Sequence, residues 1–201
     1  MSYDYFIGPQ GVFPSELIAA LFTAFQFGFM ATESRRPRTA PADAQRLGRV
    51  FPSMGLAIGV GLVARLVCGF LKVGTFAGAE RAWLVWLGVG MVLLGWGLRI
   101  WAQQTLGRFF TGEVAVQRNH QVVQSGPYRW VRHPSYTGGV LSAVGFGLML
   151  NTWLGALISA AMLAWAYAVR VPREEALLAQ ALGAAYANYM ARTKRFVPFV
   201  F

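Results

Sequence analysis

The chain has 201 residues, which is enough for one domain. It is 56% hydrophobic and only 13% charged, which is too apolar for an ordinary soluble fold and far too apolar for a disordered chain. The net charge is +10, but the basic residues lie between apolar blocks, so we expect them to face anionic membrane lipids and expect no nucleic-acid partner. The single cysteine, Cys68, excludes an internal disulfide and a multi-cysteine metal site, and no metal is expected.

Three apolar stretches in the first half of the chain predict membrane-spanning helices. The first runs from Phe13 to Thr32, with Ser15 as the expected N-cap, and no cleavable signal is evident before it. The second runs from Met54 to Leu71 and the third from Ala82 to Trp101. Glycines in the third stretch are expected to allow close contact between helices, at positions 88, 90, 95 and 97.

The second half begins with a long polar stretch from Gln103 to Tyr136. An apolar run from Thr137 to Val169 follows, interrupted only by the turn signal Asn151 to Trp153. We expect a hairpin of two short helices, each near or below the ~20 residues that a bilayer normally requires. From Arg173 the chain becomes polar and helical.

These patterns predict an all-α, polytopic integral membrane protein with about five transmembrane helices, the last two forming the short hairpin. Residues 1–201 are expected to form one domain, with three N-terminal spans in 1–101 and the polar, chemistry-bearing half in 102–201. Five spans bring the arginine-rich loops and the tail to one side of the membrane. By the positive-inside rule that side is cytoplasmic, so the C-terminus is expected inside and the N-terminus outside.

Arg65 is a charged residue within the second apolar stretch. A charge at that depth normally pairs with another group or faces a polar cavity. Its role is open between the wall of a functional site, a structural pair and an arginine that snorkels to the surface.

Pro134 is expected to open the fourth helix, because proline suits the first helical position and disfavours helix at the residue before it. His133 then lies just outside the helix, where free backbone N–H groups and the positive end of the helix dipole could seat an anion. The alternative is a plain helix start at headgroup level, with Arg129, Arg132 and nearby aromatic residues as interface anchors.

Arg170 and Glu174 are four residues apart and therefore share one helix face, with Glu175 adjacent. Alone, the pair reads as a solvated surface ion pair. The hairpin, however, returns the chain to the side that it left, so His133 and Arg170 are expected to flank one polar pocket beside lipid.

The segment "SGPYRWVRHPSYTG", followed by "REEALL" and "GAAYANYMARTKRFVPF", resembles the isoprenylcysteine carboxyl methyltransferase family and the related phospholipid methyltransferases. The resemblance covers Gln103 to Phe199 and implies a cytoplasmic site for S-adenosylmethionine, with S-adenosylhomocysteine as the product. It implies contacts to the cofactor from His120, Gln121, Val122, Val123, Tyr128, His133, Pro134, Ser135 and Tyr136. Glu113 or Gln117 supplies another contact, and the choice between them is open. Arg170 and Glu174 fall where the family contacts the methyl acceptor and are the expected catalytic and substrate-binding residues.

The resemblance implies a membrane methyltransferase that acts on a lipophilic acceptor, lipid-borne or prenylated, by carboxyl O-methylation. The alternatives are N- or O-methylation of a phospholipid or another lipid, an NADPH-dependent enzyme similar to sterol reductases, and a non-enzymatic scaffold or transporter. Eukaryotic members carry extra N-terminal helices, and an aromatic residue often stands where this chain has Gly139. The short Ala-, Gly- and Arg-rich chain indicates a prokaryotic cytoplasmic membrane.

Overall fold

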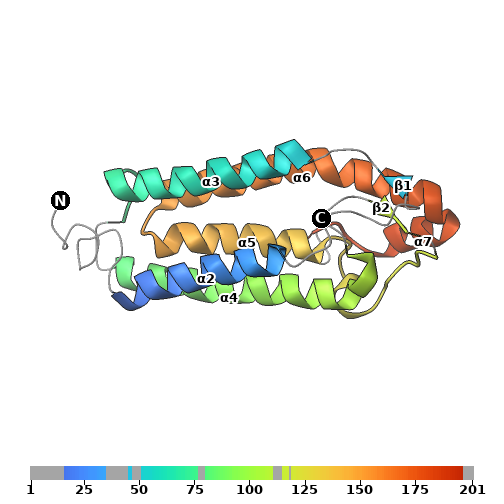
Figure 1. The fold of residues 1–201 in the computed structure, drawn as a ribbon, viewed down its shortest axis with the longest axis horizontal. Helices are drawn as coiled ribbons and strands as arrows, with labels where there is room; N and C mark the ends of the chain where they lie inside the picture. Colours follow the sequence, from blue (N-terminus) through green and yellow to red (C-terminus); the bar gives the residue numbers. More distant parts are fainter. Residues whose placement is uncertain are drawn as a thin grey trace.

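The structure is a computed structural model, and it describes residues 16–34, 45–46, 51–76, 80–110, 115–117 and 119–196. Five long helices run side by side along the longest dimension of the molecule (Figure 1). They are α2 (Glu16–Ser34), α3 (Phe51–Leu71), α4 (Glu80–Leu106), α5 (Pro134–Met149) and α6 (Trp153–Leu182), and a short helix α7 (Ala184–Arg192) follows them. The predicted all-α class is correct, apart from one antiparallel ladder between the two-residue strands β1 (Gln45–Arg46) and β2 (Ala115–Val116).

The helices pack as two pairs, α4 with α5 and α3 with α6. One apolar cluster joins α2, α4 and α5 around Phe22, Val89 and Met149, and a second joins α3, α5 and α6 around Ala57 and Leu163. Helix α5 contributes to both clusters and therefore lies at the centre of the bundle.

Two glycine pairs bring α4 and α5 close together. A Cβ atom at Gly88 would lie 2.7 Å from the carbonyl oxygen of Gly145, and one at Gly95 would lie 2.5 Å from that of Gly138. The expectation of close contact is therefore confirmed at positions 88 and 95. It is wrong at positions 90 and 97, where a Cβ atom meets nothing within 4 Å, because they point away from α5.

The predicted hairpin is confirmed in its first helix and its turn. Helix α5 begins at Pro134, as expected, and its 16 residues span ~24 Å. Asn151 takes a left-handed conformation in the turn (φ 55°), and the side chain of Thr152 accepts a hydrogen bond from Gly155 N at the start of α6. This turn contacts the α3–α4 loop, because the backbone N–H of Trp153 donates to the carbonyl of Gly74 in that loop.

The second hairpin helix is longer than predicted. Helix α6 has 30 residues and continues through Pro172 to Leu182, so the expectation of a short helix is wrong. An internal proline costs about 3 kcal/mol in a helix. Here buried residues on both sides of it, Tyr167 and Val171 in the apolar cluster and Glu175 in polar contacts, hold the helix together.

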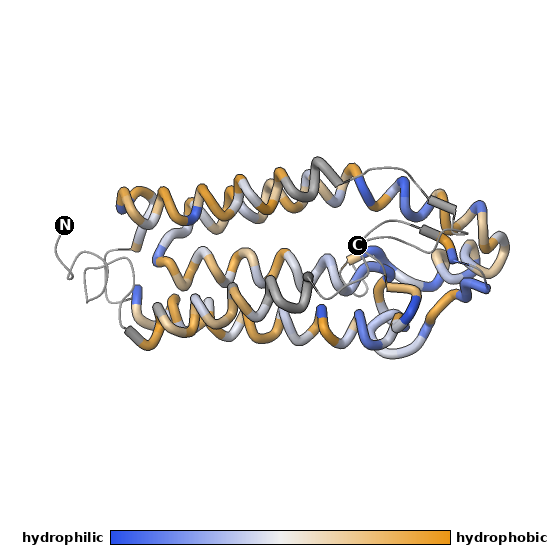
Figure 2. The backbone as a smooth tube through the Cα atoms, in the orientation of Figure 1, coloured by the Kyte–Doolittle hydropathy of each residue, from blue (hydrophilic) through white to orange (hydrophobic). Residues whose placement is uncertain are grey.

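Two stretches in the described residues are long and apolar enough to cross a membrane, Arg81–Phe109 and Trp153–Leu182, and Leu56–Leu71 is a shorter apolar helix. The predicted count of five spans is not confirmed. Hydrophilic residues gather at the end of the bundle that carries α7 (Figure 2). The expected N-cap Ser15 lies outside the described residues.

Candidate active site

The hydrophilic end is organised by the C-terminal residues 193–196, which we call the C-terminal strap. The strap runs parallel to residues 131–133, with Val131 paired to Lys194 in a short ladder. The next two backbone N–H groups, of residues 132 and 133, donate to strap carbonyls at 2.8 and 3.0 Å. This ladder brings the strap, residues 193–196, against the segment that leads into α5.

Glu175 is the centre of the polar contacts under the strap. Its side chain is only 7% exposed, and its carboxylate accepts from Arg132 Nε at 2.7 Å and from Arg195 NH2 at 2.9 Å. His133 Nε2 lies 3.3 Å from the same carboxylate. One carboxylate from α6 therefore joins the segment before α5 to the strap.

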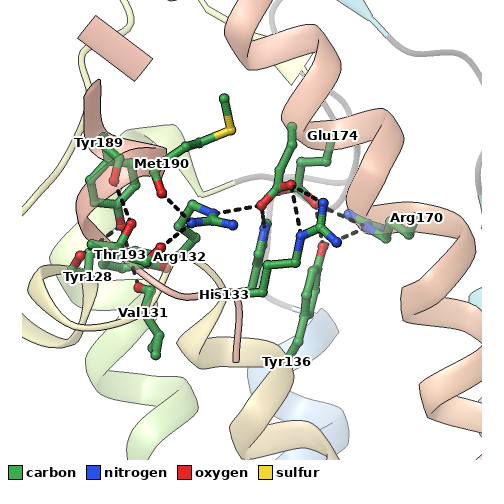
Figure 3. A network of polar contacts seen from close by, with 12 residues as sticks. Tyr128, Val131, Arg132, His133, Tyr136, Arg170, Glu174, Tyr189, Met190 and Thr193 are labelled. Atoms are coloured by element: carbon green, nitrogen blue, oxygen red, sulfur yellow. Dashed lines mark hydrogen bonds and ion pairs between the residues drawn. The ribbon is translucent and has the colours of Figure 1, made fainter. Parts of the chain in front are cut away.

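Arg132 is held on its other side by the end of α7. Its NH1 group donates to the carbonyls of Met190, at 3.0 Å, and Thr193 (Figure 3). The hydroxyl of Tyr189 donates to the carbonyl of Tyr128 at 2.7 Å. Helix α7 is thus fixed to the same segment as the strap, and Arg132 and His133 are held in place before α5 begins.

A second polar cluster lies beside Glu175 and consists of Arg170, Tyr136 and Glu174; we call it the Arg170–Tyr136–Glu174 cluster. The Tyr136 hydroxyl donates to Glu174 Oε2 at 2.7 Å and accepts from Arg170 Nε at 2.7 Å (Figure 3). The direct distance from Arg170 Nε to Glu174 Oε2 is 3.7 Å. The predicted i,i+4 pair is therefore present, but Tyr136 of α5 bridges it, and Arg170 is buried rather than solvated.

Aromatic rings enclose Tyr136 on both faces. The ring of His133 stacks on it at 5.3 Å between centroids, and the ring of Tyr167 stacks at 4.4 Å. Phe196 of the strap lies 6.0 Å from His133, which extends the aromatic surface. A Cβ atom at Gly139 would lie 2.6 Å from the Tyr167 hydroxyl, so this glycine makes room for Tyr167.

The expected cofactor residues at the start of α5 lie together with the expected acceptor residues. His133, Pro134 and Ser135 are buried, and Tyr136 contacts both Arg170 and Glu174. The Ser135 side-chain oxygen is buried and has no hydrogen-bond partner among the described residues. The Ser135 carbonyl accepts from Arg99 NH1 at 2.9 Å, which ties α4 to the first turn of α5.

Tyr128 also belongs to this region, where its backbone carbonyl accepts a hydrogen bond from Tyr189. It is buried in the short 3-10 helix Gly126–Arg129. Burial, with the negative charge of Glu174 nearby, raises the pKa of Tyr128 above its ordinary value, so the phenol remains protonated.

His120, the first of the expected cofactor residues from His120 to Val123, makes contacts away from the start of α5. The ring of His120 stacks on Phe109 at 4.4 Å, and its Nδ1 lies 3.5 Å from the backbone nitrogen of Gln117. The Gln117 side chain donates to the carbonyl of Arg108 at 2.7 Å. In the described structure these contacts join His120 and Gln117 to the 3-10 turn Gly107–Phe109 that follows α4, not to His133. Glu113, the alternative to Gln117, lies outside the described residues.

Sequence reasoning missed the central role of Glu175 and the contacts of Arg99 and Tyr167. Glu175 was noted only as a neighbour of Glu174. The buried residues Leu163, Tyr167 and Val171 recur every four positions, and the next position in that series is Glu175. This spacing is the signal that could have placed Glu175 on the buried face of α6.

Comparison with known proteins connects this site to one family. The model of the isoprenylcysteine carboxyl methyltransferase (ICMT) family matches residues 87–180. Protein-S-isoprenylcysteine O-methyltransferase B of Arabidopsis thaliana is 37% identical over 130 residues, covering 62% of this chain and 65% of the relative. A probable protein-S-isoprenylcysteine O-methyltransferase of Oryza sativa subsp. indica is 32% identical over 128 residues, covering 62% of this chain and 67% of the relative.

The structure of a eukaryotic intramembrane Ras methyltransferase, ICMT, has the same fold. It superposes with a TM-score of 0.60 at 24% identity, covering 75% of this chain and 53% of that chain. The chain thus spans about two thirds of the length of the plant relatives and about half of the solved protein. Likeness to this intramembrane protein, together with two described helices that are long and apolar enough to cross a bilayer, makes the chain an integral membrane protein. The matched region contains α5 and most of α6, which carry the Arg170–Tyr136–Glu174 cluster. The chain therefore belongs to the isoprenylcysteine carboxyl methyltransferase family.

Proposed function

We propose that the chain transfers a methyl group from S-adenosylmethionine to the carboxylate of a lipid-borne acceptor. The observation that carries this proposal is the Arg170–Tyr136–Glu174 cluster at the hydrophilic end of membrane helices. A buried arginine that is anchored by a tyrosine suits an acidic head group, while the acceptor's apolar part stays in lipid. Membership of the ICMT family supports the same reaction class.

The residues at the start of α5 fit the cofactor. The unpartnered hydroxyl of Ser135 and the positive end of the α5 dipole suit the amino-acid carboxylate of the cofactor. The backbone N–H groups of Tyr136 and Thr137 are already bonded to the carbonyl of His133, so the sequence-based expectation of several free N–H groups at this helix start is wrong for these two residues. When bound, the cofactor supplies an electrophilic methyl group. His133, Pro134 and Tyr128 would complete the holding set, together with His120 to Val123 if that stretch closes toward α5.

The proton balance favours a carboxylate acceptor. A carboxylate oxygen already carries the electron pair that forms the new bond, so no base is required. Arg170 would hold and orient the carboxylate. The ester product is neutral and binds Arg170 less strongly than the acid, which favours release. Glu174, held by Tyr136, would then orient Arg170 rather than take a proton.

We assign the hydrophilic end to the cytoplasm and the N-terminus to the opposite side, in a prokaryotic cytoplasmic membrane. The support is the arginine-rich content of that end, which favours the inside of a membrane. The acceptor would enter from the lipid and the cofactor from water. A small lipophilic acid and a prenylated chain both satisfy this geometry.

Single-turnover methyl transfer tests the roles of the cluster, with saturating cofactor and either a prenylcysteine carboxylate or a lipophilic amine as acceptor. With the carboxylate, Glu174→Gln should keep substantial activity, whereas Arg170→Lys should lose most of it, because lysine lacks the planar fork. If Glu174 is instead a general base for an amine or phenol, Glu174→Gln should lose about 10²–10⁴-fold. Full activity in both Arg170→Ala and Glu174→Gln would remove the cluster from the mechanism.

A further inference from the structure

Arg65 is a buried cation in the apolar helix α3, far from the cluster that the proposed reaction uses. It is only 6% exposed. Its NH1 group lies 3.4 Å from the carbonyl oxygen of Ala143 in α5 and 3.4 Å from the hydroxyl oxygen of Ser159 in α6. Its guanidinium carbon lies 5.7 Å from the centre of the Phe146 ring.

These contacts leave the charge of Arg65 without a countercharge among the described residues. Both acceptors are neutral, and 3.4 Å is longer than a normal N–H···O hydrogen bond. The Nε atom is buried with no hydrogen-bond partner in the described structure. A charge at this depth of a membrane protein normally pairs or marks a site, because an uncompensated buried ion is strongly unfavourable.

The position of Arg65 separates it from the proposed methyl-transfer site. Ala143 is seven residues from Tyr136 along α5, a distance of ~10 Å. Ser159 is eleven residues from Arg170 along α6, a distance of ~16 Å. The guanidinium lies where α3 and α6 meet α5, between the two packed helix pairs.

The hydroxyl group of Ser159, beside Arg65, already donates to backbone carbonyls. It is within donating distance of the carbonyls of Gly61, at 2.9 Å, and Gly155, at 2.7 Å, so its oxygen is oriented to accept from Arg65. The polar groups around the guanidinium are therefore all acceptors, and what the place lacks is negative charge. An anion would accept from the Nε group and supply the missing countercharge.

We propose that Arg65 is the anion-binding residue of a second, intramembrane site, which takes the acidic head of a membrane-borne amphiphile. The head is a carboxylate or a phosphate monoester, since both match the planar N–H fork of arginine. The apolar part of the amphiphile lies against lipid-facing side chains next to the site, Val63 and Leu66 of α3 and Leu157 of α6, which are all exposed.

The test uses the full chain in a neutral detergent, with dodecanoate and dodecyl phosphate as probes and dodecanol as the uncharged control. Arg65→Met keeps the length of the side chain and removes its charge. Without probe, the Met variant should unfold at a higher temperature than wild type, because a buried charge without a partner is removed. The probes should raise the unfolding temperature of wild type but not of the Met variant, and dodecanol should raise neither.

Binding measured by calorimetry gives a second readout. Arg65→Met should weaken binding of an acidic probe by about tenfold or more, as expected for loss of charged hydrogen bonds. Arg65→Lys, which keeps the charge and loses the fork, should fall between the two. The exposed Arg129→Met serves as the matched control and should bind like wild type. A preference for one probe identifies the head group as carboxylate or phosphate.

The structural alternative gives the opposite results. If Arg65 only fills the space between helices, Arg65→Met should lower the unfolding temperature, and the probes should act equally on wild type and variant. That outcome would overturn the proposal. Neither readout uses methyl transfer, so a failure here leaves the proposed function untouched, and an inactive protein leaves this site untouched.

Discussion

Replacing Glu175 with glutamine should release the C-terminal strap from the segment before α5. Glu175 is the only acidic group that the described contacts place between Arg132, His133 and Arg195. Glutamine has the same shape but no charge, and its amide N–H group faces cations. Breaking a buried ion pair by removing one partner costs about 3–5 kcal/mol. We take the low end, about 3 kcal/mol, because the Arg195 side chain is 38% exposed and its charge stays partly solvated.

Hydrogen exchange measures this release directly. The N–H groups of Arg132 and His133 donate to strap carbonyls, so their exchange reports opening of the strap. A loss of about 3 kcal/mol predicts exchange ~10²-fold faster in Glu175→Gln, since about 1.4 kcal/mol corresponds to a factor of ten. Arg195→Gln is the matched control, and removal of this more exposed partner should cost about 1 kcal/mol or less. Equal exchange in wild type and Glu175→Gln would refute the account of the strap.

Three further predictions follow from the packing and the charges. Gly88→Ala should lower the unfolding temperature in detergent, at a cost of about 1–3 kcal/mol, because its Cβ would meet a backbone carbonyl at 2.7 Å. Gly90→Ala is the control and should leave the unfolding temperature unchanged, because a Cβ atom there has open space. Equal effects of the two substitutions would contradict the described packing. Gly139→Ala should weaken S-adenosylhomocysteine binding, because the new Cβ atom would lie 2.6 Å from the Tyr167 hydroxyl and displace that side chain. The double variant with Tyr167→Phe should bind normally, because the nearest ring carbon of residue 167 lies at 3.8 Å. Weak binding in the double variant would contradict this steric explanation. Burial and a neighbouring arginine lower the pKa of His120 below its ordinary value near 6.5. The local structure should therefore be stable above that pH and lose stability as the pH falls below it, and this loss should be absent in His120→Gln. Hydrogen exchange near residue 120 measures the loss, and the same pH dependence in wild type and His120→Gln would contradict the prediction.

The bundle could be predicted from local signals because each signal acts over a few residues. Pro134 fixes the start of α5, and Asn151 and Thr152 fix the turn that follows. The length of α6 could not be read in the same way. A change from apolar to polar sequence at Arg170 resembles a helix boundary, whereas buried contacts from other elements carry the helix past Pro172.

The candidate site was predicted in its parts but not in its connections. The i,i+4 spacing of Arg170 and Glu174 gave their contact, and the hairpin brought them near His133. The bridge through Tyr136 and the anchoring of the strap by Glu175 depend on residues 20 to 43 positions apart in the sequence. No local pattern encodes such contacts, because they arise only when α5, α6 and the strap pack together.

The most direct test of the central claim is methyl transfer from methyl-labelled S-adenosylmethionine to N-acetyl-S-farnesylcysteine, compared with its carboxamide. The two acceptors share the same apolar chain and differ only in the carboxylate. The account predicts label in the acid alone, released as methanol by alkali as expected for a methyl ester, and lost in Arg170→Ala. Equal labelling of the carboxamide, or alkali-stable label in the lipid fraction, would contradict carboxyl methylation at the Arg170–Tyr136–Glu174 cluster.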